Sequence, residues 1–550
     1  MLFDSIRTIV RNALERLGLA DVEPTIELPR HESHGDAATT VALQVARRLG
    51  KPPRTIAEEI VARMDYDPSR IAAVEIAGPG FINFRFRPRY FADVFERILD
   101  RGERFGFSDR YAGKRANVEY VSANPTGPLH PGHGRNVALG DSIARLLEAV
   151  GYRVTREYYF NNAGRQMQNL ARSIYARYRQ LLGDTDYPFD EENGYKGEYI
   201  FDIARELIAE YGDRLRQESD EALAICRTKG EQWCFASIRR TLERLGVHHD
   251  VFFNEHSLYT DGHIERTIAA LRERGLVYEK DGATWIATTK LGLEQDRVIV
   301  KSTGEPTYRL PDMAYHCIKL SRGDDLIVDV FGADHIATIQ EVLAAVGALG
   351  YDTSRVKVVL HQMVTFMKDG APYKLSKRSG EQYTLDDLID ELGPDVVRYF
   401  FVMRAAETQL VFDLDLARQQ SETNPVFYLQ YAHARICSVF ANARQLGIEL
   451  LSRDALALDR IEHPAECALI RTLAQFPDVV ERAADQLAPY IVADYLHTAA
   501  EAFHTFYHEC RILGAQSDDL VRVRLALADA TRTVLRNGLS VLGVSAPERM

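Results

Sequence analysis

The chain has 550 residues, with 67 Lys and Arg against 79 Asp and Glu, and a formal net charge of −12. This length predicts three to four domains of roughly 150 residues each. A hydrophobic content of 46% with 27% charged residues excludes a disordered or fibrous chain, and no apolar run approaches the roughly 18 residues that a membrane helix needs.

The pattern of residues 1–110 predicts a small α/β unit. The first twenty residues have the apolar spacing of an amphipathic helix and not the pattern of a signal peptide. Further helices are expected near 37–49 and 55–63, followed by two strands around a Gly78-Pro79-Gly80 turn. The second strand, 81–87, alternates apolar residues with polar and basic ones, which predicts a half-buried sheet with one basic face. That face is either simply solvated or an RNA contact.

From Lys114 onward, strands alternate with helices, as in a parallel sheet with crossover helices. Strands are expected in the segments KRANVEYV and YRVTREYYF, with a helix between them. Residues from about 164 to 290 are mostly helical and polar, which predicts an insertion between two halves of the sheet domain. Sheet patterns resume at TWIATT, DRVIVKS, DDLIVDVFG and VKVVLHQMV.

The apolar pattern of residues 421–550 predicts only helices. Asn424-Pro425 is typical of a helix start, and three apolar stripes follow at helical spacing, which indicates a helical bundle.

The six cysteines are scattered, with no CxxC pair and no His at zinc-finger spacing. This pattern predicts reduced thiols in a cytosolic protein and no structural zinc. The acidic total argues against a nucleic-acid binder, but binding depends on local basic faces and not on net charge.

His130-Pro131-Gly132-His133 follows a predicted strand and opens a predicted helix. Two imidazoles three residues apart at a helix N-terminus can both face a place where free N–H groups favour an anion. Gly132 allows a base or phosphate to come close to the backbone. A lone match of this kind is weak evidence, because a helix-capping His is common.

A second motif, Lys374-Leu375-Ser376-Lys377-Arg378, places two lysines around a small serine in a polar loop. Such a loop can hold a phosphate chain with two point charges. Taken alone, a solvated basic loop would be the simpler interpretation, but the pairing with the first motif in this order favours phosphate binding.

These motifs resemble those of class I aminoacyl-tRNA synthetases, HPGH being similar to the HIGH motif and KLSKR to the KMSKS motif. More narrowly, the chain resembles the arginyl-tRNA synthetases of the bacterial type in the segments VEYVSANPTGPLHPGHGRN, YRLPD, KLSKRSG, NPVFYLQYAHAR, LGVSAPERM and AGPGFINF. The resemblance spans nearly the whole chain. Pro131 replaces the usual Ile or Val, and Leu375 replaces Met, but neither change removes a polar group.

The resemblance implies an α/β class I Rossmann-like parallel-sheet catalytic domain at 111–420, with the insertion at about 164–290 and the KMSKS loop at 374–380. It also implies an N-terminal α/β add-on domain at 1–110 that contacts the tRNA D-loop, and an all-α anticodon-binding bundle at 421–550.

The resemblance also implies which residues form the site. The catalytic residues would be His130, Gly132, His133, Lys374, Ser376 and Lys377. The ATP-binding residues would be Ala123, Pro125, Thr126, Gly127, Gly332, Asp334 and His335, together with both histidines and both lysines of the motifs. For Asp334 and His335, capping of the following helix is the alternative interpretation.

An arginine pocket must satisfy a planar cation with five donors, which calls for carboxylates and oriented acceptors. The resemblance places Glu119, Asn124, Tyr308 and Asp312 there. We expect the two carboxylates to hold the guanidinium while Asn124 and Tyr308 position the α-amino end or line the pocket. Taken singly, each of the four could equally be a solvated or capping side chain.

The activity implied is an ATP-dependent arginine-tRNA ligase that forms arginyl-adenylate only with its tRNA present, uses Mg2+ with ATP, and acts as a cytoplasmic monomer away from membranes. One alternative is a small-molecule nucleotidyltransferase, which would have no use for the two terminal units. A synthetase for another amino acid is disfavoured by the acidic pair Glu119 and Asp312. A non-enzymatic RNA-binding paralogue would have lost the motif residues, yet both histidines and both lysines are present.

Overall fold

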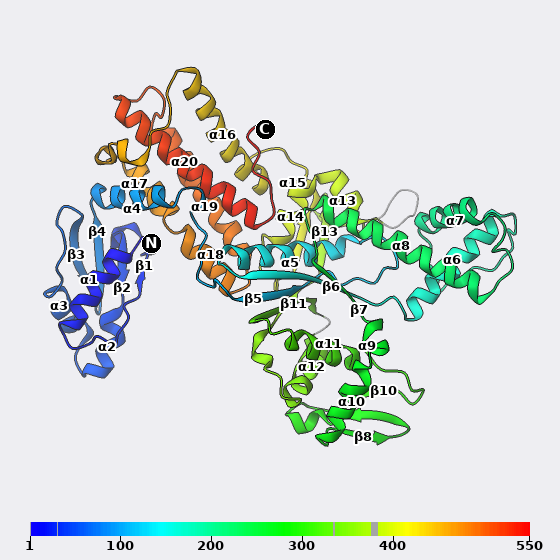
Figure 1. Cartoon of the computed structure of the whole chain (residues 1–550). Coiled ribbons are helices and arrows are strands. Elements are labelled where there is room, and N and C mark those ends of the chain that lie inside the picture. Colours follow the sequence, from blue (N-terminus) through cyan, green and yellow to red (C-terminus); the bar gives the residue numbers. More distant parts are fainter. Residues whose placement is uncertain (1, 30, 334–335, 376–382) are drawn as a thin grey trace.

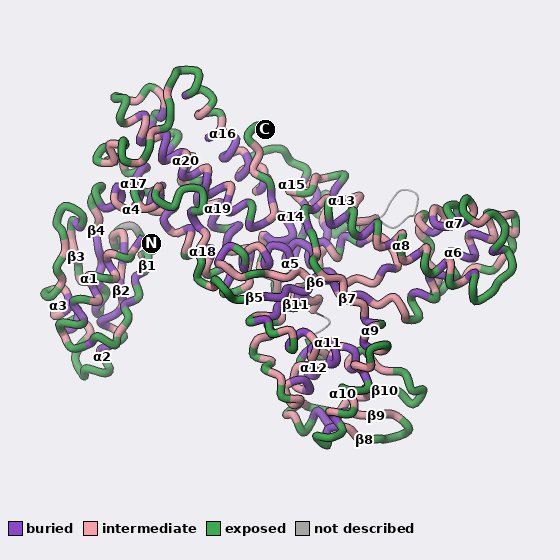
Figure 2. The backbone as a smooth tube through the Cα atoms, viewed as in Figure 1, coloured by how far each residue is buried: buried purple, intermediate pink, exposed green. Residues whose placement is uncertain are grey.

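The computed structural model describes residues 2–29, 31–333, 336–375 and 383–550. Figure 1 shows a central sheet domain with an N-terminal unit on one side, a helical hairpin on the other, a small unit below and a helical bundle above. The buried backbone is concentrated where these parts meet around helix α5 (Figure 2).

The N-terminal unit is an antiparallel sheet in the order β1-β2-β4-β3 with helices packed on it. Its elements are α1 (Asp4–Glu15), β1 (Ile26–Glu27), β2 (Ala37–Thr39), α2 (Val41–Leu49), α3 (Pro53–Val61), β3 (Ile71–Ala77), β4 (Phe81–Phe86) and α4 (Pro88–Arg101). The helix expected from residue 37 begins only at Val41, because residues 37–39 pair with β4 instead.

The central sheet is wholly parallel, as predicted, in the order β12-β11-β5-β6-β7. Its strands are β5 (Arg115–Glu119), β6 (Arg153–Phe160), β7 (Val251–Asn254), β11 (Leu326–Gly332) and β12 (Val356–His361). Helix α5 (Pro131–Ala149) crosses from β5 to β6 and is buried along most of its length. The carboxyl ends of these strands therefore share one edge, where open parallel sheets bind ligands.

The segment expected as one helical insertion is divided by a strand. Helices α6 (Arg165–Leu181), α7 (Glu198–Tyr211) and α8 (Asp220–Arg244) form a hairpin-like unit with its own apolar core. The chain then returns to the central sheet as β7, which pairs in parallel with β6. Four residues are too few to show a periodic pattern, so the sequence did not reveal this strand.

A second unit below the sheet has its own apolar core. It contains α9 (His256–Thr260), α10 (His263–Glu273), β8 (Val277–Lys280), β9 (Ala283–Ile286), β10 (Arg297–Val300), α11 (Arg309–Ser321) and α12 (Ile336–Ala348). Strands β9 and β10, expected to resume the main sheet, form a separate antiparallel sheet with β8. Helix α11 leads directly back into β11 of the central sheet.

The remaining chain forms a small sheet and the predicted bundle. The sheet and its helices are β13 (Val364–Lys368), β14 (Ala371–Pro372), α13 (Leu385–Leu392), α14 (Pro394–Val402), β15 (Leu410–Asp413) and α15 (Leu414–Ala417). The bundle is α16 (Pro425–Gln445), α17 (Pro464–Leu473), α18 (Phe476–Asp485), α19 (Tyr490–Glu509) and α20 (Asp518–Val541).

A buried arginine joins three parts of the molecule. Arg398 of α14 is 1% exposed, and its guanidinium donates to Asp141 Oδ2 at 2.6 Å, to Leu245 O at 2.7 Å and to Leu542 O at 3.1 Å. These acceptors lie on α5, after α8 and after α20, so this one side chain ties the sheet domain to the helical hairpin and the bundle.

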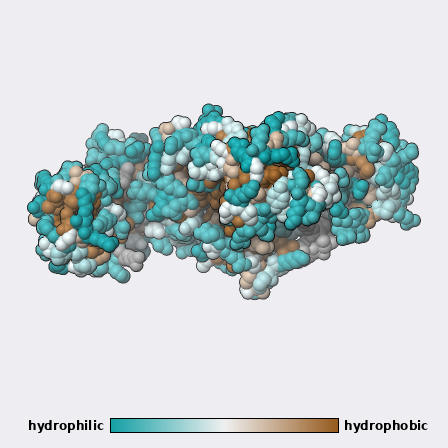
Figure 3. All heavy atoms as spheres, turned by 90° about the horizontal axis from the view of Figure 1, so that it is seen from below, coloured by the Kyte–Doolittle hydropathy of each residue, from teal (hydrophilic) through white to brown (hydrophobic). Residues whose placement is uncertain are grey.

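Seen from below, the surface is mostly hydrophilic, with hydrophobic atoms gathered over the N-terminal unit and the middle of the molecule (Figure 3). Within the part of the chain that the structure describes, no helix is both long and apolar enough to cross a membrane.

Candidate active site

The two histidines of the first motif cap the helix that they open. His130 is the N-cap residue of α5, and its Nδ1 accepts a hydrogen bond from the Gly132 N–H at 2.9 Å. His133 Nδ1 accepts from the His130 N–H at 3.0 Å. A Cβ atom on Gly132 would lie 3.1 Å from His130 Nδ1, so glycine allows this close approach.

These hydrogen bonds determine where each imidazole carries its proton. Because both Nδ1 atoms accept from backbone N–H groups, a neutral ring must carry its proton on Nε2. Burial lowers the pKa of His133 to about 4, with a further contribution from His130, and burial also lowers the pKa of His130. Both rings are therefore neutral at pH 7 and present Nε2–H donors, so they can bind an anion by hydrogen bonds without carrying a charge themselves.

The loop between β5 and α5 begins with strained backbone. Val121 and Ser122 have φ angles of 69° and 45°, a region that is unusual for any residue with a side chain and most of all for valine. The strain is held in place because the Val121 N–H donates to Asn136 Oδ1 of α5 at 2.6 Å and Ser122 Oγ accepts from the Tyr159 N–H at 3.1 Å. The turn brings residues 123–128 across the sheet edge.

The predicted ATP-binding residues of this loop are held by tyrosines from two other elements. Tyr158 Oη of β6 donates to Ala123 O, and Tyr199 Oη of α7 donates to Thr126 O, both at 2.7 Å. Pro125 is buried, and a Cβ on Gly127 would lie 3.0 Å from Tyr199 Oη. The helical hairpin is thus in direct contact with the loop.

Glu119 and Asn124 lie at the same sheet edge. Glu119 is the last residue of β5 and is 3% exposed. Its Oε1 accepts from Ser122 Oγ at 3.0 Å and its Oε2 from Lys319 Nζ at 2.6 Å. Asn124 Oδ1 accepts from the Asn161 N–H at 2.9 Å, and its Nδ2 donates to Gln166 Oε1 at 2.8 Å.

Asp312 lies in the first turn of α11 and is half-buried. Burial raises the pKa of Asp312 to about 7, and the negative charges of Glu119 and Glu255 raise it further, against the opposing effect of His316 and Lys319. A carboxyl group with this pKa gains strongly from a bound cation. The structure therefore brings Glu119 and Asp312 into one electrostatic environment.

The side chain of Tyr308 is exposed, unlike that of Asp312, which was predicted to line the same pocket. It is the N-cap residue of α11, one turn before Asp312, but its side chain is 82% exposed. Among the described residues no side chain covers the Tyr308 ring, so the structure does not place this ring in the wall of a pocket.

Sequence reasoning missed Glu255, which directly follows β7 at the same sheet edge and is 7% exposed. Its carboxylate accepts from Tyr159 Oη and from Asn161 Nδ2, both at 2.8 Å. Burial raises its pKa despite these two donors. Recognising β7 as a strand would have revealed it, because Glu255 then stands at the carboxyl end of a parallel strand, as Glu119 does.

Of the remaining predicted residues, only some lie in the described part of the chain. Gly332 ends β11, next to His361 of β12. Lys374 is exposed, two residues beyond β14. Asp334, His335, Ser376 and Lys377 lie outside the described residues.

A hydrogen bond joins the start of α13 to the residue before the first motif. After the second motif, the Leu385 N–H donates to Leu129 O at 2.8 Å. Leu129 directly precedes His130, so the start of α13 lies beside the first motif.

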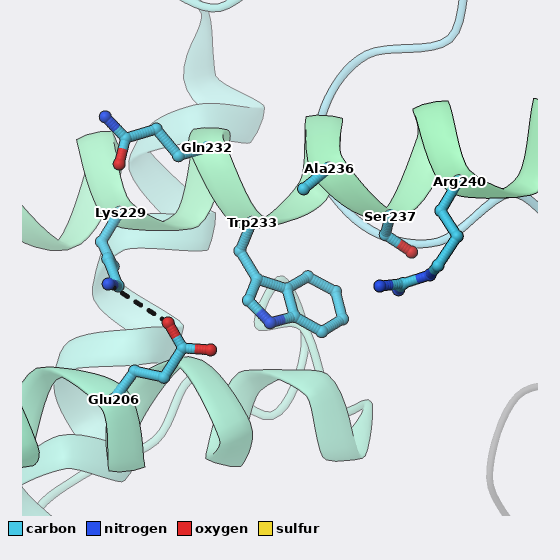
Figure 4. A pocket seen from close by; sticks show the side chains of 7 residues that line it. All are labelled: Glu206, Lys229, Gln232, Trp233, Ala236, Ser237 and Arg240. Atoms are coloured by element: carbon cyan, nitrogen blue, oxygen red, sulfur yellow. Dashed lines mark ion pairs between the residues drawn. The ribbon is translucent and has the colours of Figure 1, made fainter.

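A separate cavity of about 350 Å³ lies between α7 and α8 (Figure 4). Its lining includes the Lys229–Glu206 ion pair, Trp233 and Arg240. Its seven lining residues include none of the residues predicted for the site, and the cavity lies within the helical hairpin and not at the sheet edge.

The parallel sheet and its histidine motif fit a class I aminoacyl-tRNA synthetase, and comparison with protein families shows that this part of the chain is the catalytic domain of one. Residues 96–399 match the family model described as "tRNA synthetases class I (R), catalytic domain". Residues 4–86 match "Arginyl tRNA synthetase N terminal domain", and residues 429–550 match "DALR anticodon binding domain". The chain belongs to the arginyl-tRNA synthetase family.

Curated relatives are similar along the whole chain. The arginine–tRNA ligase of Salinibacter ruber is 49% identical, covering 100% of both chains. That of Desulfotalea psychrophila is 48% identical over 96% of this chain and 94% of its own.

Solved structures are similar in fold. A putative arginyl-tRNA synthetase from Campylobacter jejuni has a TM-score of 0.77 at 31% identity, covering 84% of this chain and 100% of its own. The Thermus thermophilus arginyl-tRNA synthetase has a TM-score of 0.76 at 22% identity and covers 100% of both chains, which supports the fold alone.

Proposed function

We propose that this chain attaches arginine to its cognate tRNA in two steps, with the residues at the carboxyl edge of the central sheet in the roles given below. The observation that carries the proposal is the presence, at this edge, of two neutral Nε2–H donors together with the buried carboxylate of Glu119 and the half-buried carboxyl group of Asp312. The full-length similarity to arginine–tRNA ligases supports the same activity.

In the first step, the α-carboxylate of arginine attacks the α-phosphorus of ATP. The new carboxyl–phosphate bond forms as the bond to the β-phosphate breaks, and pyrophosphate leaves with the electron pair. His130 and His133 donate hydrogen bonds to the phosphates through Nε2–H, and Lys374 and Lys377 hold the departing end. No side chain acts as nucleophile, because positioning and stabilisation of the developing charge supply the catalysis.

In the second step, the terminal ribose hydroxyl of the tRNA attacks the carbonyl carbon of arginyl-adenylate; the ester bond forms as the carboxyl–phosphate bond breaks, AMP leaves with the electron pair, and the hydroxyl proton is released. Within the described residues, no group of three His, Cys, Asp or Glu side chains could hold a metal ion. Mg2+ would therefore enter on the phosphates of ATP, where it would neutralise part of their charge.

The amino-acid pocket selects a cation. Glu119 and Asp312 face the guanidinium, Asn124 orients the loop beside it, and Tyr308 closes over the bound substrate. A planar guanidinium satisfies two carboxylates with directed N–H donors, whereas the ammonium of lysine offers a single point charge.

The other units bring the tRNA. Residues 1–110 contact the D-loop, the catalytic domain spans 111–420, and the bundle from 421 reads the anticodon. We propose that adenylate forms only with the tRNA bound and that the enzyme works as a monomer in the cytoplasm.

Pyrophosphate exchange with arginine, lysine or cysteine, each with and without total tRNA, tests the proposal. We expect exchange only with arginine and only with tRNA. Exchange without tRNA would refute the tRNA requirement, and exchange with lysine would refute the pocket assignment. A small-molecule nucleotidyltransferase would show no amino-acid-dependent exchange.

A further inference from the structure

Three buried carboxylates stand side by side across the middle of the central sheet. Asp329 of β11 is the register partner of Glu119 of β5, which in turn is the register partner of Glu157 of β6. Their exposed fractions are 0%, 3% and 0%. Burying like charges so close together, away from water, costs free energy unless cations compensate them.

Helix α11 and the residue that ends it supply those cations. Lys319, which is 0% exposed, donates from Nζ to Glu119 Oε2 at 2.6 Å and also to an oxygen of Asp329. Arg322 donates from Nη1 to Glu157 Oε2 at 2.6 Å. Lys319 therefore pairs with Glu119 and Asp329, whereas Arg322 pairs with Glu157.

The same face of α11 leads from Lys319 to the second carboxyl group of the pocket. His316 lies between Asp312 and Lys319 at helical spacing, so the three share one face. The Nε2 atom of His316 is 3.0 Å from Asp329 Oδ2, and its Nδ1 is 2.7 Å from the backbone oxygen of Asp312. Burial alone would lower the pKa of His316, but the hydrogen bond and charge of Asp329 outweigh it and raise that pKa.

The Glu119 carboxylate is thus held at both oxygens before any substrate arrives, by Lys319 on one side and by Ser122 Oγ on the other. Burial opposes the charge on Lys319, yet the carboxylates of Asp329 and Glu119 raise its pKa. A carboxylate held in this way keeps one orientation, which removes part of the ordering cost when a cation binds.

We propose that Lys319 is a positioning residue for arginine: from behind the pocket it aims Glu119 and, through Asp329 and His316, fixes the distance between Glu119 and Asp312. This inference rests on the proposed function, in which these two carboxyl groups hold the guanidinium. Lys319 is fully buried and does not itself contact the substrate.

The test compares kinetic constants of full-length variants in tRNA charging. We expect Lys319→Met to raise the KM for arginine about tenfold or more, since misplacing a binding group by an ångström commonly costs this much. The KM values for ATP and tRNA should stay within about twofold, because the histidine donors do not depend on this row.

Arg322→Met is the matched control, because it removes a cation from the same end of α11 that pairs with Glu157 and not with Glu119. It should leave the arginine KM within about twofold of the parent value. If Lys319→Met does not fold, Asp329→Asn replaces it, because this variant keeps Lys319 but removes the negative charge of its second anchor. We expect it to raise the arginine KM about threefold without changing the KM for ATP.

The inference is wrong if Lys319→Met and Asp329→Asn leave the arginine KM unchanged, if they raise the arginine and ATP KM values equally, or if Arg322→Met has the same effect as Lys319→Met. Failure of the proposed function looks different, since the parent enzyme would then show no arginine-dependent charging. A normal parent with an unaffected Lys319→Met variant overturns the positioning role alone.

Discussion

In the proposed pocket, where Asp312 holds the guanidinium, the pKa of Asp312 should make arginine binding depend on pH in the range where most enzymes are assayed. Burial raises this pKa to about 7, with Glu119 and Glu255 adding to the effect. The ionised carboxylate is the form that pairs with a guanidinium, because the protonated acid offers one fewer acceptor and no charge. Raising the pH therefore increases the fraction of enzyme that is ready to bind arginine.

The magnitude follows from that pKa. With a value of about 7, roughly one molecule in eleven carries ionised Asp312 at pH 6 and about ten in eleven at pH 8. The apparent Kd varies inversely with the competent fraction, so it should fall about tenfold between these two pH values, or about 1.4 kcal/mol. The Kd should level off above about pH 8, where ionisation is complete.

Calorimetric titration of the full-length protein with L-arginine at half-unit steps from pH 6 to pH 8 measures this directly. Asp312→Asn is the control, which should bind arginine more weakly at every pH and show a nearly flat profile. His133 does not contribute to this profile, since its pKa is about 4. The reasoning fails if the parent profile is flat, if arginine binds more tightly at pH 6, or if Asp312→Asn keeps the parent profile.

The stability of the folded protein provides a second check, because it should depend on pH in the opposite direction to arginine binding. The pKa of Asp312 is higher in the folded protein than its ordinary value of 3.8, so the folded state binds the proton more tightly than the unfolded state. The contribution of this group to stability is therefore full at low pH and is lost as pH rises from about 4 through about 7. Without arginine, the stability of Asp312→Asn relative to the parent should increase over that range.

Three further outcomes are expected. His133→Asn keeps an acceptor for the His130 N–H but loses the Nε2–H donor, so single-turnover adenylate formation should slow about 10²-fold to 10³-fold with tRNA affinity unchanged; an unchanged rate would remove His133 from the phosphate site. Arg398→Met removes three buried charge-assisted hydrogen bonds, although Arg145 still pairs with Asp141 at 2.7 Å, so the free energy of unfolding in urea should fall by about 2–3 kcal/mol; a fall under about 1 kcal/mol would contradict this. Glu255→Gln removes a negative charge that raises the Asp312 pKa, so the midpoint of the arginine-binding profile should move to lower pH, and an unmoved midpoint would separate Glu255 from the pocket.

Local patterns were sufficient for much of this protein. Alternating strands and helices predicted the parallel sheet, and helical apolar stripes predicted the C-terminal bundle, because both signals repeat within a single element. The His130 motif could be placed at a helix N-terminus from its neighbours alone. The family resemblance came from short segments whose identity is visible without any fold.

Tertiary structure determined the electrostatics of the site. The neutrality of both motif histidines follows from burial, and the backbone donors determine which ring nitrogen carries the proton. Glu255 entered the site only because the four-residue strand β7 returns to the sheet after the helical hairpin. Neither burial nor the return of a short strand has a local sequence pattern.

The sequence by itself predicted the longer helices and four of the five central strands, and it proposed residues for binding ATP and arginine. The register of three strands placed Asp329, Glu119 and Glu157 in one row, and the packing of α11 placed Lys319 against two of them. Glu119 and Lys319 are 200 residues apart in the chain. Side-chain periodicity is a property of neighbours along the chain, whereas register and burial arise from contacts between distant segments, so only the folded protein could show how its acidic pocket is held.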